Sequence, residues 1–151
     1  MEMVQIKGVD STERSTVADL SAGAKLIIRE RLLTHGTQHA VSGFVVNLNG
    51  EDSSANVVSS SVVKGDSIQT FLAEINGNAK CAGHSECDAI IMGNAKISAI
   101  PKIMANHTDA ALIHEAAIGK IAGEQLVKLM TLGLTEAEAE AEEQIVNGFL
   151  K

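Results

Sequence analysis

The side chains with ligand or catalytic chemistry gather in the second half of this 151-residue sequence. A thiol, an imidazole and a second thiol fall within seven residues, from position 81 to position 87. Such groups bind zinc and iron, so this segment forms a plausible half of a metal site, although its Cys-x5-Cys spacing is not that of a zinc finger. The residues concerned are Cys81, His84, Glu86 and Cys87, then His107, His114 and Glu115, with a weaker group at His35 and His39.

Most of these side chains also have an ordinary structural explanation. Cys87 precedes the apolar run Ala89-Ile90-Ile91, and a lone cysteine there is typical of a small buried residue, as is Cys81. Histidines beside glycine, asparagine or threonine are typical of turns and loops. This interpretation applies to His35, His39, His84 and His107.

His114 and Glu115 stand at the end of an apolar run that begins at Ala110. Adjacent residues on a strand point to opposite faces, so at most one of the two faces a given partner unless the strand bends. A structural histidine with a surface glutamate is an equal alternative to a site. Catalysis by Cys87 as nucleophile with His114 as base is also conceivable, but no glycine-rich oxyanion signature lies near Cys87.

The elements that position these residues are short strands. From about Val17 to Ile113 the sequence alternates apolar runs with glycine, asparagine and aspartate, and no helical pattern interrupts it. Pro101 fits a strand edge or a strand end. Asn49-Gly50 is compatible with a hairpin, and periodicity alone does not separate a β-helix from a meander or a sandwich.

After Gly119 the apolar residues recur at the spacing of a helix. Leu126, Leu129 and Met130 form one apolar stripe. Thr135 and Glu138 then have the spacing of a capping box that begins a second helix. The acidic residues of that helix are interpreted as a solvated face, with a docking surface for a basic partner as the alternative.

Composition narrows the class of protein. The net charge of -7 opposes binding to nucleic acid, and 45% hydrophobic residues are enough for the core of one domain. The sequence has neither a membrane-spanning apolar stretch nor a signal peptide, so we expect a cytoplasmic protein without a membrane partner. Reduced thiols rather than a disulfide are expected in that compartment.

Several segments, in the same order and at compatible spacing, resemble the SufB/SufD family of iron-sulfur cluster assembly scaffold proteins. The resemblance covers roughly Lys25 to Lys151. The segments that carry it are Gly43 to Gly50, Gly83 to Gly93 with its Cys87-Asp88 pair, Ile113 to Ile121 with its His-Glu-Ala motif, Glu124 to Leu126, Gly133 to Ala139, and Gly148 to Leu150.

The resemblance implies a mainly β fold and a scaffold role rather than an enzyme. One domain, residues 1–151, would contain a short right-handed parallel β-helix at about 17–115 and a C-terminal two-helix subdomain at about 119–151. The protein would dimerise with itself or with a SufB/SufD-like subunit and dock a SufC-type ABC ATPase through its C-terminal helices. The alternative is a structural or regulatory relative that binds partners but no cluster.

Carried over residue by residue, the resemblance places the family's interface ligands on Cys87, His114 and Glu115. They would hold an iron-sulfur cluster or iron across the subunit interface. Full-length family members are several times longer, so this chain would begin well inside the β-helix. Residues Met1 to Ser15 or a partner would then cover the exposed first layer. Cys81 and His84 receive no role from the resemblance.

Overall fold

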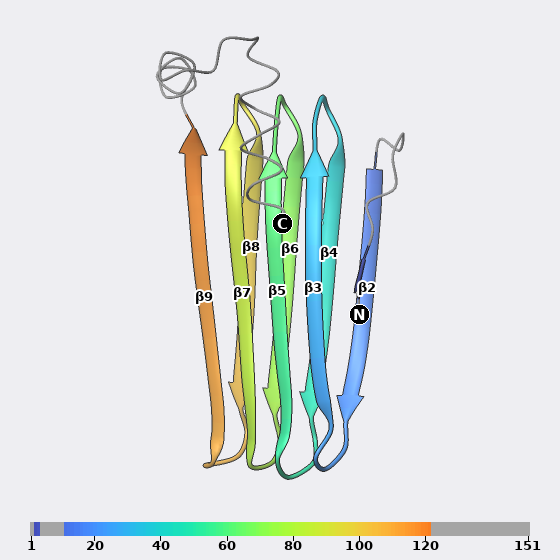
Figure 1. Cartoon of the computed structure of the whole chain (residues 1–151), viewed down its shortest axis with the longest axis vertical. Coiled ribbons are helices and arrows are strands. Elements are labelled where there is room, and N and C mark those ends of the chain that lie inside the picture. Colours follow the sequence, from blue (N-terminus) through green and yellow to red (C-terminus); the bar gives the residue numbers. More distant parts are fainter. Residues whose placement is uncertain (1, 4–10, 122–151) are drawn as a thin grey trace, which may run out of the picture.

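The structure is a computed structural model of the 151-residue chain, and it describes residues 2–3 and 11–121. Long strands joined by short turns make up this described part (Figure 1). In chain order they are β1 (Glu2–Met3), β2 (Ser11–Leu20), β3 (Lys25–Thr34), β4 (His39–Leu48), β5 (Ser53–Val63), β6 (Ile68–Gly77), β7 (Cys81–Met92), β8 (Lys96–Ala105) and β9 (Ala110–Ile121). All pairings between these strands are parallel.

The strands form two facing sheets of one solenoid. Sheet A has the order β1-β3-β5-β7-β9 and sheet B the order β2-β4-β6-β8, so from β2 onward consecutive strands alternate between the sheets (Figure 1). Each strand pairs with the equivalent strand of the next coil. Ser11 is thus opposite His39, 28 positions on, and Lys25 is opposite Ser54, 29 positions on. The predicted parallel β-helix is therefore confirmed as a parallel β-solenoid.

The solenoid extends beyond the boundaries predicted for it, which were about 17 and 115. β2 begins at Ser11, and β9 continues through Gly119 to Ile121. The two helices predicted within 119–151 fall on residues from 122 onward, outside the described residues. Asn49-Gly50 is not a hairpin, because it connects β4 of sheet B to β5 of sheet A.

The core lies between the sheets and follows from the alternation of side chains along each strand. In β5 every second residue from Ser53 to Ser61 is buried. Phe44 of β4 and Phe71 of β6 lie in contact across neighbouring coils, with ring centroids 5.9 Å apart. Burial of such a ring stabilises the fold by about 1.5–3 kcal/mol. The most buried apolar side chains include Ile28, Phe44, Val46, Leu48, Val57, Val62, Val63 and Ile75.

The turns stack on one another as regularly as the strands. Equivalent turns are occupied by Gly36, Gly65 and Gly93. All three have positive φ angles, which residues with a side chain rarely adopt. At the other end of the strands, the side-chain amide of Asn78 donates to Asn49 Oδ1, and the side-chain amide of Asn106 donates to Asn78 Oδ1, each at 2.7 Å. The polar residues between the apolar runs therefore hold successive coils together.

The first described residues belong to the solenoid itself. Ser11 to Ser15 form half of β2 and pair with β4, while Glu2–Met3 pairs with β3 in sheet A. Pro101 lies in β8, which has β6 as its one partner among the described strands, in agreement with the prediction of an edge position. Residues 2–3 and 11–121 contain no helix long and apolar enough to cross a membrane.

Candidate functional site

Cys87 lies in the interior of the solenoid. In β7 it alternates with outward-facing residues, and its side chain has no exposed surface. The register places it opposite Ser59 of β5 and Ala116 of β9, and Ser59 is in turn opposite Glu30 of β3. The inward column through Cys87 therefore holds a carboxylate and a hydroxyl as well as the thiol.

Glu30 is buried, with 2% of its surface exposed, and two serines bind it. Ser59 Oγ donates to one carboxylate oxygen at 2.7 Å, and Ser42 Oγ, from β4 of sheet B, donates to the other. Buried carboxylates are costly unless such hydrogen bonds compensate them. A polar cluster thus bridges the two sheets beside Cys87. The sequence signal for Glu30 is its place between the inward-facing Ile28 and Leu32 on β3.

The surroundings of Cys87 keep its thiol protonated. Burial, reinforced by the nearby charges of Asp88 and Glu30, raises the pKa of Cys87 to about 11. A cysteine nucleophile needs the opposite shift, towards a thiolate at neutral pH. The geometry of the single chain therefore opposes catalysis by Cys87 with His114 as base.

The raised pKa of Cys87 predicts a loss of stability at alkaline pH. The unfolded thiol, with an ordinary pKa of 9.0, ionises before the folded thiol does at about 11. The contribution of the protonated Cys87 thiol to the free energy of unfolding is complete below the pKa of the unfolded thiol. It is lost as the pH rises through the pKa of the folded thiol. Urea midpoints measured from pH 8 to pH 11 should fall more steeply for the wild type than for Cys87→Ser. Parallel profiles would contradict the shift.

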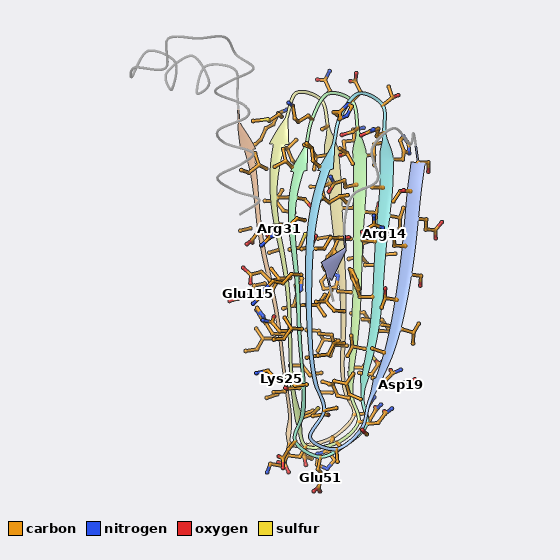
Figure 2. The ribbon with its side chains drawn as sticks, turned by 45° about the vertical axis from the view of Figure 1, so that its right-hand side comes forward. Arg14, Asp19, Lys25, Arg31, Glu51 and Glu115 are labelled. Carbon is orange, nitrogen blue, oxygen red and sulfur yellow. The ribbon has the colours of Figure 1, made fainter. Side chains whose placement is uncertain are left out.

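His114 and Glu115 point to opposite sides of sheet A, as strand alternation requires. His114 is half-buried on the inward side, where its Nδ1 shares a 2.7 Å hydrogen bond with Oγ of the buried Ser85. Glu115 is exposed on the outer face, where Figure 2 shows it projecting away from the space between the sheets. Cys87 and His114 thus share the interior, and Glu115 is separated from both by the sheet.

The outer face of sheet A brings a different set of side chains to Glu115. His84 Nε2 lies 2.9 Å from Glu115 Oε2, and His84 Nδ1 lies 2.9 Å from Asn56 Oδ1. Glu86 is directly opposite Glu115 in the register of β7 and β9. The prediction of a turn for His84 was wrong, because it lies within β7 and alternates there with the buried Ser85. Its neighbour Gly83, whose residue type indicated a turn, occupies an inward-facing position within the strand.

The remaining candidates have structural positions. Cys81 is buried in the core cluster, as expected for a small buried residue. His107 lies in the turn between β8 and β9, where its Nδ1 accepts a hydrogen bond from the amide of Asp109 at 3.1 Å. His35 lies in the turn after β3, and its amide donates to Gln38 Oε1 at 3.0 Å. His39 is the first residue of β4 and is exposed.

Comparisons with known proteins show which family this chain is similar to. Residues 3–149 match the family described as SUF system FeS cluster assembly, SufBD core domain. An iron-sulfur cluster assembly SufBD family protein of Methanocaldococcus jannaschii is 38% identical over 107 residues, which are 70% of this chain and 33% of that protein. A relative of the same description in Archaeoglobus fulgidus is 38% identical over 111 residues, covering 73% of this chain and 30% of the relative.

A more distant relative in Mycobacterium tuberculosis, also described as an iron-sulfur cluster assembly SufBD family protein, is 32% identical over 118 residues. That match covers 76% of this chain and 14% of the relative. The chain thus spans a third or less of the length of these relatives. Because the family match includes nearly the whole chain, this protein belongs to the SufBD core domain family.

Proposed function

We propose that this protein acts in iron-sulfur cluster assembly as a scaffold or accessory subunit that pairs through the β9 end of its solenoid. The observation that carries the proposal is the match of residues 3–149 to the SufBD core domain, with Cys87 placed one strand from that end. The cluster is cargo here, and its proposed ligands are Cys87, His114 and Glu115. The proposed setting is the cytoplasm, with a SufC-type ATPase docked through the C-terminal residues 119–151.

The exposed side chains of β9 support pairing at this end. Among the described strands, β9 has β7 as its one partner in sheet A. Ile118 continues the inward column of Leu32, Ser61 and Ala89, yet it is 45% exposed because no further described coil covers it. An open strand edge with apolar side chains is a template for strand addition. A second SufBD-type solenoid offers matching strands and a matching core.

Pairing also addresses how cargo would reach Cys87. The thiol, imidazole and carboxylate are donor types that bind iron, but Cys87 has no exposed surface in the single chain. Ala116 of β9 is the neighbour of Cys87 on the side of the open end. We infer that rearrangement of β9 on pairing exposes the thiol and brings it together with ligands from the other subunit.

Changing Ile118 to lysine is expected to prevent pairing, because a charge at the open end of the core would be buried without a partner in the dimer. Size-exclusion chromatography with light scattering should give a dimer, or a heterodimer with a longer SufBD subunit, for the wild type and a monomer for Ile118→Lys. The matched control is Val17→Lys on β2, because Val17 is 64% exposed at the opposite end of the described solenoid. Equal masses for Ile118→Lys and wild type would contradict pairing through β9.

A second candidate function is that of a structural or regulatory protein that keeps the partner surfaces but binds no cluster. The complete burial of Cys87 and its raised pKa favour this alternative, since a protonated, enclosed thiol is a poor ligand. Such a protein would bind the ATPase in a pull-down assay without acquiring iron and sulfide. The dependence of cluster binding on Cys87 separates the two functions.

A further inference from the structure

Three side chains on the outer face of sheet A have the chemistry and the proximity of metal ligands. His84 and Glu86 lie two residues apart on β7, and Glu115 faces them from β9. One donor atom from each lies within 4.8 Å of the others. A small rotamer adjustment therefore brings all three to the roughly 2.0–2.2 Å that nitrogen and oxygen ligands keep from a zinc ion.

The imidazole of His84 is held in the orientation that a ligand needs. Asn56, on the neighbouring strand β5, presents Oδ1 to His84 Nδ1 at 2.9 Å. Because Nδ1–H donates to this carbonyl oxygen, Nε2 is the nitrogen directed towards Glu115, and in the 2.9 Å contact Nε2 donates to the carboxylate through a proton that a metal ion would replace. Metal-binding histidines in proteins are oriented by the same kind of hydrogen bond from their other nitrogen.

The charges around His84 also favour a cation. Glu86 and Glu115 are direct register neighbours, an arrangement of like charges that destabilises a sheet. On the other side of Glu86 the register continues to Val58, which separates it from Arg29. A bound cation would relieve this repulsion.

We propose that His84, Glu86 and Glu115 form a binding site for a divalent transition-metal ion such as Zn²⁺ or Fe²⁺ on the outer face of sheet A. One imidazole and two carboxylates suit these ions, and the exposed side of the site leaves room for water as a further ligand. The site is distinct from the proposed cluster ligands because Cys87 and His114 lie on the inward side of the same strands. Glu115 is the one residue common to both sets.

The test is calorimetric titration of the chelator-treated 151-residue protein with Zn²⁺ at neutral pH. One saturable equivalent per chain is expected for the wild type, and His84→Ala or Glu86→Gln should abolish it. Asn56→Ala should weaken binding by about 10–100-fold, because the imidazole loses its orienting partner. His84 and Glu86 are not core residues, and circular dichroism of each variant verifies the fold.

Two matched controls separate this site from other sources of binding. His107→Ala removes an exposed turn histidine, and Cys87→Ser removes the thiol of the proposed cluster site; both should bind Zn²⁺ as the wild type does. Titration with Co²⁺ should give a spectrum without thiolate charge transfer. The proposal is overturned if the wild type binds no Zn²⁺, if His84→Ala binds it unchanged, or if Cys87→Ser loses it. Failure of the cluster function leaves all these outcomes unaffected.

Discussion

Replacing Gly50 with alanine is expected to destabilise the solenoid by more than about 3 kcal/mol, a large part of the roughly 5–15 kcal/mol of a typical domain. Gly50 lies in the turn between β4 and β5, stacked on the equivalent turn of the preceding coil. Its amide donates to Leu20 O at 3.1 Å. A Cβ atom at Gly50 would overlap backbone atoms of Ser21 and Ala22. Backbone atoms cannot move aside as the end of a flexible side chain can.

Urea unfolding followed by circular dichroism measures this effect. The matched control is Gly119→Ala on β9, where an added Cβ meets no atom within 4 Å. That control should change the free energy of unfolding by less than about 0.5 kcal/mol. A Gly50→Ala protein with the wild-type unfolding midpoint would mean that the turns do not stack as closely as described.

The alternation of apolar and polar residues predicted strands, but it did not predict their length. Val57-Val58 and Val62-Val63 give the signal of two short strands separated by serines, whereas both pairs belong to β5. The serines between them do not interrupt the strand because Ser59 binds the buried Glu30. Glu30, 29 positions earlier in the chain, thus stabilises a serine-rich segment that the local residue pattern indicates as a break between two strands.

The coil repeat also explains which site residues the sequence analysis missed. Glu30 and Ser59, or His84 and Asn56, are far apart in sequence and become neighbours only when coils of 28 or 29 residues are stacked. Without that register, the alternation with Ile28 and Leu32 places Glu30 on the inward face, but nothing in the sequence indicates that Ser59 lies beside it. The placement of His114 and Glu115 on opposite faces of the sheet was predictable, because the alternation of side chains along a strand alone requires it.

The substitution Cys87→Ser is expected to remove cluster binding while the fold is retained. Serine is close to cysteine in size, and the interior at this position already contains the hydroxyl of Ser59 and the carboxylate of Glu30. A hydroxyl there has polar neighbours, but it does not replace a thiolate as a ligand of an iron-sulfur cluster. The matched control is Cys81→Ser, which changes the other buried cysteine and should leave cluster content unchanged.

Anaerobic reconstitution with iron and sulfide tests the central claim most directly, with visible absorption, bound iron, bound sulfide and oligomeric state measured for the wild type, Cys87→Ser and Cys81→Ser. A scaffold should show absorption and stoichiometric iron and sulfide in the paired wild type and in Cys81→Ser, and neither in Cys87→Ser. A colourless wild type, or equal iron and sulfide in Cys87→Ser, would contradict a cluster held by Cys87.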